Sequence, residues 1–327
     1  MAHYSTGAPK KQPLRGRRVL WPLRLPLSSG EICLHTLAMQ SVTFRVPATT
    51  ANLGPGYDCL GIALGLANRV TVTRLPAVQE KPPVGFHPGD AMAAEAAEQF
   101  FLKSSLTEFP FAWNIEGEVP RSRGLGSSVT VRLGLLAGLN ALADSPLSRQ
   151  DLFELCASLE GHPDNAAPAA FGGFTVAGGE GTVRFEVRPE LTFVLLIPDF
   201  EVSTPAARQV LPAQLDHAAA VMSCANACRI TAAFASQNYG LLRGAFADGL
   251  HQPFRRSLIP FLTEVIAAGE RAGAIGGFLS GSGSTICCVT ESEPKHVAEA
   301  MSAAAIGTHT VLMTHADNAG ASLLSSQ

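Results

Sequence analysis

Two glycine-rich segments of the chain have the composition of anion-binding loops. Residues 124–128 read Gly-Leu-Gly-Ser-Ser and run directly into an apolar stretch that we expect to be helical to about residue 142. Glycines let the backbone approach a polyanion closely, and the free N–H groups and dipole of a helix start favour negative charge. Ser127 and Ser128 could add hydroxyl groups, as donors to a phosphate or as a Mg²⁺ ligand. The segment is neither a Walker A loop nor a dinucleotide-binding fingerprint, and taken alone it could be an ordinary turn.

The second glycine-rich segment, residues 279–284, reads Leu-Ser-Gly-Ser-Gly-Ser and precedes an expected strand over residues 285–290. It is interpreted either as a tight connection between a helix and a strand or as a backbone nest. A nest of this kind would close over phosphates or substrate.

Polar and charged side chains are concentrated in two further segments. Residues 160–165 read Glu-Gly-His-Pro-Asp-Asn directly after an expected helix, and such groups are costly to bury unless each has a partner. They form either a surface turn or part of a site. Residues 203–208, Ser-Thr-Pro-Ala-Ala-Arg, are typical of a strand end followed by a capped helix start. Arg208 is then either a solvated residue or a clamp for a carboxylate, which suits its fork of donors.

The elements expected to position these segments are strands and helices that alternate without regular βαβ spacing. The expected strands cover residues 41–46, 68–74, 111–118, 171–176, 183–187, 193–197, 285–290 and 310–313. The expected helices cover residues 91–103, 124–142, 147–160, 216–247, 258–272 and 295–305. Several strands are adjacent along the chain, which favours a two-domain α+β protein over a doubly wound parallel sheet.

Length and composition agree with an enzyme of two domains. The chain has 327 residues, of which 46% are hydrophobic and 16% charged. We find no uninterrupted apolar run near the ~18–20 residues of a membrane span, and therefore expect no membrane association. The seven cysteines are scattered without paired Cys-x2-Cys motifs, so we expect buried thiols in a reducing cytoplasm.

The N-terminal residues 1–38 differ from the rest of the chain. They contain six basic residues, one acid and four prolines, which leaves 18 basic and 26 acidic residues in 39–327. We interpret this segment as an unstructured or spurious upstream extension, with a transit peptide as the alternative. The acidic remainder argues against nucleic acid as a partner. The expected domains are residues 39–195, which would bind ATP, and residues 196–327.

The ordered motifs together resemble those of the GHMP kinase family, which includes galacto-, homoserine, mevalonate and phosphomevalonate kinases. The resemblance covers residues 41–327. Residues 47–61 (Pro-Ala-Thr-Thr-Ala-Asn-Leu-Gly-Pro-Gly-Tyr-Asp-Cys-Leu-Gly) resemble its first motif, residues 123–128 its phosphate loop, and residues 279–283 its third motif. Residues 51–58, 160–165, 203–208 and 250–260 resemble the homoserine kinase branch in particular.

The resemblance implies a fold and a reaction. The fold would have an N-terminal ribosomal-protein-like α/β domain and a ferredoxin-like C-terminal domain with the site between them. The reaction would use ATP and Mg²⁺ to phosphorylate the hydroxyl of L-homoserine in threonine biosynthesis, and the protein would be a homodimer. The alternatives are a family kinase of another small alcohol, such as shikimate or a mevalonate derivative, and a non-catalytic nucleotide-binding relative.

By motif position, the resemblance also implies the site residues. Those around homoserine would be Asn52, Asp58, His162, Asp164 and Asn165, with Arg208 and Arg255 on its carboxylate. Those at the ATP phosphates would be Arg123, Gly124, Leu125, Gly126, Ser127, Ser128, Ser280, Gly281, Ser282 and Gly283. The metal ligands would be Ser128 and Glu154, with Glu160 as the alternative carboxylate. Asp58 would accept the hydroxyl proton or orient the substrate, and Asn68 and residues 87–90 would contact adenine.

Overall fold

The computed structural model describes residues 41–76, 89–179 and 181–326, which lie within one compact unit that starts at Ala38. The expected extension over residues 1–38 lies outside the described residues. So do two of the residues expected to contact adenine, 87 and 88, because residues 77–88 are not described.

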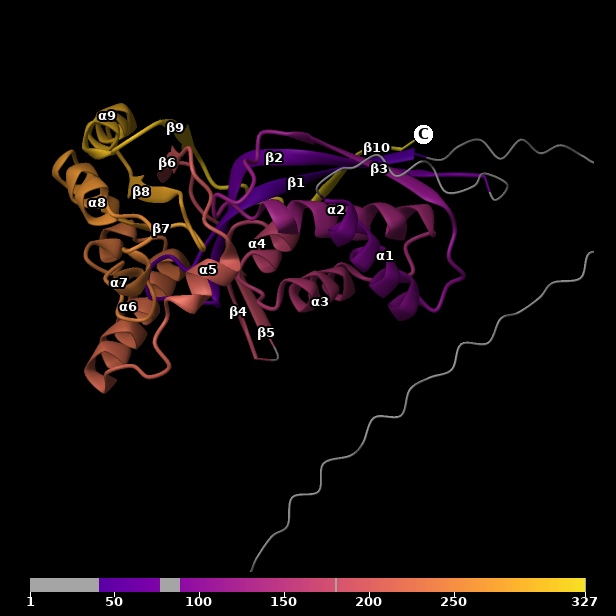
Figure 1. Ribbon diagram of the computed structural model, residues 1–327, viewed down its shortest axis with the longest axis horizontal. Helices are drawn as coiled ribbons and strands as arrows, with labels where there is room; N and C mark the ends of the chain where they lie inside the picture. The colour runs from indigo at the N-terminus through magenta and orange to yellow at the C-terminus, as the bar shows by residue number, and fades with distance from the viewer. Residues whose placement is uncertain (1–40, 77–88, 180, 327) are drawn as a thin grey trace, which may run out of the picture. The chain divides into compact units, whose positions relative to one another are not determined.

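The first half of the fold is an antiparallel six-stranded sheet (Figure 1). Its strands are β1 (Ser41–Ala51), β2 (Leu60–Arg74), β3 (Phe111–Gly117), β4 (Phe174–Gly178), β5 (Gly181–Phe185) and β10 (Ser322–Ser326). They lie in the order β10-β1-β2-β4-β5, and β3 pairs with the far end of the long strand β2. Strand β2 therefore pairs with β1 along one edge and with both β3 and β4 along the other, so it lies inside the sheet.

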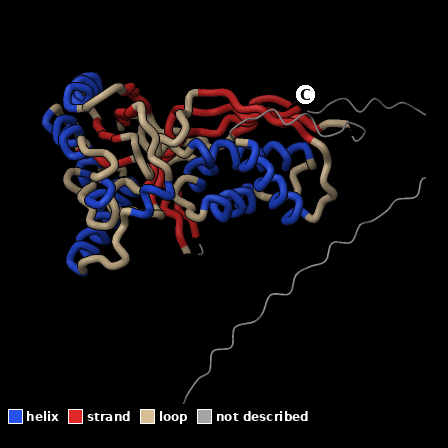
Figure 2. The backbone as a smooth tube through the Cα atoms, viewed as in Figure 1, coloured by secondary structure: helices blue, strands red, loops and turns tan. Residues whose placement is uncertain are grey.

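Four helices pack on one face of this sheet (Figure 2). They are α1 (Asp90–Ser104), α2 (Ser127–Leu142), α3 (Arg149–Glu160) and α4 (Ala166–Phe171). Helix α2 lies against β1 and β2, and an added Cβ at Gly134 or Gly138 would lie 2.5 or 2.3 Å from Val70 or Val72. Glycine therefore lets α2 approach the sheet closely, which fixes where the helix begins. Helix α3 starts with a capping box formed by Ser148 and Asp151.

The second half is an antiparallel four-stranded sheet with helices against it. The strands β6 (Thr192–Pro198), β7 (Gly276–Leu279), β8 (Ile286–Thr290) and β9 (His309–Thr314) lie in the order β7-β8-β6-β9. Helices α8 (Leu262–Arg271) and α9 (Pro294–Ala304) pack on it. The predicted two-domain α+β architecture is confirmed. The expected boundary at residues 195/196 falls inside β6, which belongs wholly to this second sheet.

The remaining helices connect β6 to β7. They are α5 (Thr204–Gln209), α6 (His217–Ser236), the 3₁₀ helix η1 (Tyr239–Leu242) and α7 (Gln252–Arg255). Helix α6 has the length and the apolar composition of a helix that could cross a membrane. Such a helix was not predicted from the sequence. Its side chains Ile230, Ala233 and Phe234 are buried in the protein core, and Asn226 donates to the carbonyl of Ala247.

A stacked aromatic pair joins β4 to α6, and its loss is expected to destabilise the fold. The rings of Phe174 and Phe234 lie 4.2 Å apart at 12°, and both side chains are almost fully buried. The Phe174→Ala substitution would leave a cavity there, so we expect the free energy of unfolding to fall by about 3–5 kcal/mol. Urea unfolding followed by circular dichroism would measure the change. Val183→Ala on the neighbouring strand is the control, because Val183 is 53% exposed. Equal losses in the two variants would contradict the expectation.

Candidate active site

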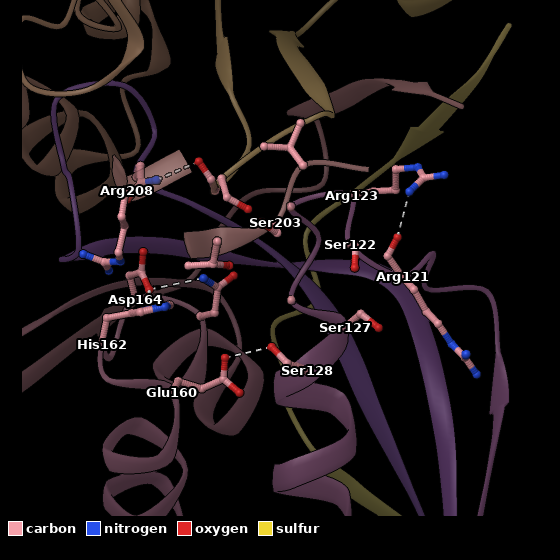
Figure 3. Close-up of a pocket in the computed structure, with 18 of the residues that line it drawn as sticks. Arg121, Ser122, Arg123, Ser127, Ser128, Glu160, His162, Asp164, Ser203 and Arg208 are labelled. Carbon is pink, nitrogen blue, oxygen red and sulfur yellow. Dashed lines mark hydrogen bonds and ion pairs between the residues drawn. The ribbon is translucent and has the colours of Figure 1, made fainter. Parts of the chain in front are cut away.

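A cavity of about 360 Å³ brings together residues from all four segments that the sequence singled out (Figure 3). One end is formed by the start of α2 and the β7–β8 loop. The other is formed by the β1–β2 loop, the turn after α3 and the first turn of α5. Residues separated by more than 200 positions in the chain therefore share one surface.

The glycine-rich loop before α2 has the geometry of an anion-binding helix start. Gly126 precedes the helix with a φ of +68°, and no side chain among the described residues caps the first turn. Gly124 has a φ of +73°, and an added Cβ there would lie 2.1 Å from the carbonyl oxygen of Ser280. The backbone N–H groups of the first turn are thus left open to a ligand, as in phosphate-binding loops.

Hydrogen bonds join this loop to the other two motifs. Ser280 Oγ donates to the Gly124 carbonyl at 2.7 Å and contacts Thr50 Oγ1 at 2.8 Å. The N–H of Gly281 donates to the Ala51 carbonyl at 3.1 Å, and that of Thr49 to the Leu125 carbonyl at 3.1 Å. The three motifs therefore form one continuous hydrogen-bonded cradle.

The expected phosphate-binding residues divide into two groups by their place in this cradle. Among the described residues, those that line the cavity are Arg123, Gly124, Gly126, Ser127, Ser128, Gly281 and Ser282. Leu125, Ser280 and Gly283 do not line it. Leu125 and Ser280 are fully buried, and Gly283 has a φ of +92°. These three residues therefore contribute to the conformation of the loops rather than to the surface of the cavity. The side chain of Arg123 is directed to the Pro198 carbonyl.

The carboxylate beside Ser128 is Glu160, which the sequence left as the alternative to Glu154. Ser128 Oγ donates to Glu160 Oε2 at 2.7 Å. Glu154 is exposed, accepts a hydrogen bond from Gln150 at 3.0 Å, and is absent from the described lining of the cavity. Six residues of an α-helix turn the side chain by roughly 120°, so the two glutamates of α3 face different directions. The expected pairing of Glu154 with Ser128 is wrong for this reason.

Arg132 is a site-adjacent residue whose role the sequence did not reveal. Its Nη1 lies 2.5 Å from Glu160 Oε1 and its Nη2 lies 2.8 Å from Glu95 Oε2. Burial disfavours the guanidinium charge, but the Glu160 carboxylate outweighs this and raises the pKa of Arg132. The sequence contains one indication of this role, because Arg132 is a single charged residue within the apolar segment that forms α2.

The turn after α3 forms a chain of hydrogen bonds at the other end of the cavity. His162 Nδ1 lies 2.5 Å from Asp164 Oδ1, Asn165 donates to the same oxygen at 3.2 Å, and Thr49 donates to Asn165 Oδ1 at 2.7 Å. Burial lowers the pKa of His162, but the hydrogen bond and charge of Asp164 outweigh it, and the net shift is upward. Asp164 is 2% exposed, so this polar turn is a buried, partnered cluster rather than a surface turn.

Asp58 and Arg208 form an ion pair at the edge of the cavity. Arg208 Nη2 lies 2.9 Å from Asp58 Oδ1, and Nη1 lies 3.1 Å from Oδ2 and 2.9 Å from the Tyr57 hydroxyl. Asp58 has a φ of +58°, and its N–H donates to Asn52 Oδ1 at 3.0 Å. Both partners are about one-third exposed, so the pair remains accessible to a charged ligand.

Arg255 is far more buried than Arg208, with only 2% of it exposed. Its Nε donates to the Ala207 carbonyl, and its Nη1 donates to the Gly281 carbonyl at 2.9 Å and to His251 Nδ1 at 3.2 Å. His251 Nε2 in turn donates to the Gly54 carbonyl. Burial lowers the pKa of His251 to about 4, so the ring is neutral and can accept at Nδ1.

Of the expected adenine contacts within the described residues, Gly89 lines the cavity and Asn68 does not. Asn68 is 5% exposed, and its amide donates to Thr130 Oγ1 and accepts from the N–H of Val119. It therefore holds β2 to α2, and it is not part of the described cavity lining. Of residues 87–90, the first two lie outside the described residues, and Gly89 lines the cavity.

Comparison with known proteins identifies the class to which this fold and site belong. The family model for the GHMP kinase N-terminal domain matches residues 91–173, and the model for the GHMP kinase C-terminal domain matches residues 230–307. The chain belongs to the GHMP kinase family, and it is an ATP-dependent kinase.

Within that family the chain is similar to homoserine kinases. It is 38% identical to the homoserine kinase of Moorella thermoacetica, over 80% of this chain and 91% of that one. It is 40% identical to the homoserine kinase of Microchaete diplosiphon, over 88% and 98%. The crystal structure of the Cytophaga hutchinsonii homoserine kinase has the same fold, with a TM-score of 0.79, 24% identity, and 92% and 100% of the two chains covered.

Proposed function

We propose that the protein transfers the γ-phosphoryl group of ATP to the side-chain hydroxyl of L-homoserine, giving ADP and O-phospho-L-homoserine. The observation that carries the proposal is the charge pattern at the end of the cavity away from the phosphate loop. Asp58 and Asp164 supply negative charge, and Arg208 and Arg255 supply positive charge, within one pocket. A small zwitterion with a hydroxyl group complements this pattern, because its ammonium and carboxylate groups need opposite partners.

The arrangement supports catalysis by positioning rather than by a strong base. Phosphoryl transfer has a loose transition state that needs in-line placement and charge neutralisation. The open N–H groups at the start of α2 would bind phosphate oxygens, and His162, Asp164 and Asn165 would orient the acceptor. Both oxygens of Asp58 already accept from Arg208, which favours its role in orienting substrate over a role as proton acceptor.

The donor set suits a magnesium ion, which the kinase family commonly requires. Ser128 and Glu160 offer a hydroxyl and a carboxylate oxygen 2.7 Å apart, and oxygen ligands of this kind bind Mg²⁺ together with substrate phosphates. Glycine at position 126 lets the loop pack closely against Thr49, because an added Cβ there would lie 2.1 Å from Thr49 Oγ1. When bound there, the ion would neutralise charge on the transferred phosphoryl group.

A coupled assay of ADP release with a panel of alcohols tests the proposed acceptor. The purified protein with ATP and Mg²⁺ should turn over L-homoserine with a kcat/KM well above that for L-serine, shikimate or mevalonate. Preference for shikimate or mevalonate would overturn the choice of acceptor while leaving the kinase class intact. Nucleotide binding without turnover of any alcohol would favour the non-catalytic alternative.

The substitution Arg208→Ala is expected to weaken acceptor binding selectively. A hydrogen bond to a charged group contributes about 1.5–3 kcal/mol, which corresponds to a KM for homoserine raised roughly 10- to 100-fold. The KM for ATP should change little, because Arg208 lies at the end of the cavity away from the loop before α2. Steady-state kinetics with each substrate varied would measure both values. A larger change in the KM for ATP than for homoserine would contradict the assignment.

A further inference from the structure

Arg132 and Ser128 lie one helical turn apart on α2 and hold the same carboxylate from two sides. Ser128 Oγ donates to Glu160 Oε2 at 2.7 Å, and Arg132 Nη1 lies 2.5 Å from Glu160 Oε1. Residues four apart on a helix share a face, so the spacing in the sequence produces this two-sided contact. Each oxygen of Glu160 therefore has its own partner on α2.

The two oxygens of Glu160 face different surroundings. Glu160 and Ser128 line the cavity, whereas Arg132 lies behind them, outside the described part of the lining. The side chain of Glu160 is 7% exposed and that of Arg132 is 14% exposed. Figure 3 shows Glu160 directed at Ser128 beside the start of α2. Oε2 is thus the oxygen on the side of the phosphate loop.

Burying part of the Arg132 guanidinium costs free energy, and its contact with Glu160 offsets this cost. We therefore take the contact with Glu160 as the main role of Arg132. Its Nε is buried without a hydrogen-bond partner among the described residues. Its other ion pair with the described residues is with Glu95 Oε2 at 2.8 Å, and the Glu95 side chain on α1 is 49% exposed. One guanidinium between two carboxylates leaves the cluster with one net negative charge. A cation beside Ser128 would therefore still be attracted.

We propose that Arg132 is a positioning residue that withholds Oε1 of Glu160, so that the carboxylate offers only Oε2 to the divalent ion and the site prefers Mg²⁺ to Ca²⁺. The proposal rests on the proposed metal site at Ser128 and Glu160. Mg²⁺ is small and takes few protein oxygens in strict octahedral geometry, whereas Ca²⁺ accepts more ligands and often binds both oxygens of a carboxylate. A carboxylate limited to one oxygen thus favours the smaller ion.

The test compares Arg132→Met with the wild-type protein by metal-dependent binding of a fluorescent ADP analogue. Titrations with Mg²⁺ and with Ca²⁺ give the two midpoint concentrations for each protein. Partners that orient metal ligands affect metal affinity by 10- to 100-fold, so the ratio of midpoints should shift about tenfold towards Ca²⁺ in Arg132→Met. An unchanged ratio in the folded variant overturns the proposal.

Two further variants distinguish the effect of the Arg132–Glu160 contact from the effect of the net charge of the cluster. Glu95→Gln removes the other partner of Arg132 without touching Glu160, so its ratio of midpoints should remain that of the wild type. Arg132→Met changes the net charge of the cluster from −1 to −2, whereas Glu95→Gln changes it to 0. A shift in Glu95→Gln as large as in Arg132→Met but in the opposite direction would therefore attribute the effect to cluster charge and overturn the proposal. If Arg132→Met does not fold, Arg132→Lys serves the same test. The guanidinium holds Glu160 with one nitrogen and Glu95 with another, which a single ammonium does not reproduce, so a shift towards Ca²⁺ is again expected.

Failure of this inference is distinguishable from failure of the proposed metal site. Glu160→Gln should abolish metal-dependent nucleotide binding if the site is correct, and wild-type midpoints in that variant would refute the site itself. A crystal structure of the wild-type protein with Mg²⁺ and a non-hydrolysable ATP analogue provides a direct readout. We expect Arg132 to remain on Oε1 there, and a Glu160 that binds the ion through both oxygens would overturn the proposal.

Discussion

Replacing Gly124 by alanine is expected to lower kcat/KM for ATP by at least about 100-fold, because a shift of about 1 Å in the residues that hold a substrate has an effect of this size. The added Cβ would lie 2.1 Å from the Ser280 carbonyl oxygen and 2.9 Å from the Gly283 nitrogen. Both neighbours are backbone atoms, so the β7–β8 loop must move away. Movement of that loop also disturbs the Ser280 hydrogen bond to Gly124. Steady-state kinetics with ATP varied would measure the loss.

Gly244→Ala is the matched control for this prediction. Gly244 has a φ of +71°, close to the +73° of Gly124, but an added Cβ there has no described neighbour within 4 Å. Both variants incur the strain of a left-handed alanine, which is about 1–2 kcal/mol. Only Gly124→Ala is expected to push the β7–β8 loop away from the loop before α2. Comparable activity in the two variants would show that the close approach of the two loops does not matter for catalysis.

On the proposed metal site, Glu160→Gln is expected to reduce kcat at saturating ATP by at least about 100-fold, since loss of a direct metal ligand should exceed the 10- to 100-fold effect of its outer partners. The amide keeps the shape of the side chain but removes the charge that attracts a cation beside Ser128. It also leaves the buried guanidinium of Arg132 with one carboxylate partner instead of two. The dependence of kcat on Mg²⁺ concentration would be measured together with thermal stability.

Glu154→Gln provides the contrasting variant on the same helix. Glu154 is exposed and contacts Gln150, so its substitution should leave both kcat and the Mg²⁺ dependence near the wild-type values. A loss of Mg²⁺ dependence in Glu154→Gln, with Glu160→Gln unaffected, would reverse the assignment made from the structure.

Local signals in the sequence were sufficient to predict much of the site. The glycines around Leu125, the polar turn at residues 160–165 and the capped start of α5 each depend on backbone chemistry within a few residues. Turn and cap preferences act over such short distances, so they can be recognised without a fold. The two-domain α+β architecture followed from the spacing of these elements and is confirmed.

Several elements had no signal of this kind. Strand β10 has the sequence Ser-Leu-Leu-Ser-Ser and is mostly exposed, so it lacks the alternation that predicts a strand. It forms because β1 presents an edge that it can pair with. Strand β7, Gly-Gly-Phe-Leu, is shorter still and was not predicted, and pairing with β8 accounts for it. Pairing with a partner strand overrides local propensity in both cases.

The sequence by itself determined the class of the protein and the acidic, basic and glycine residues from which its site is built. Only the tertiary structure decided which of these side chains meet. It placed Glu160 rather than Glu154 beside Ser128, and it paired Asp58 with Arg208. It also engaged the amide of Asn68 in hydrogen bonds with Thr130 and Val119. The physical reason is that a side chain's partners depend on the rotation of its helix and on contacts between distant segments, neither of which is encoded in the local sequence.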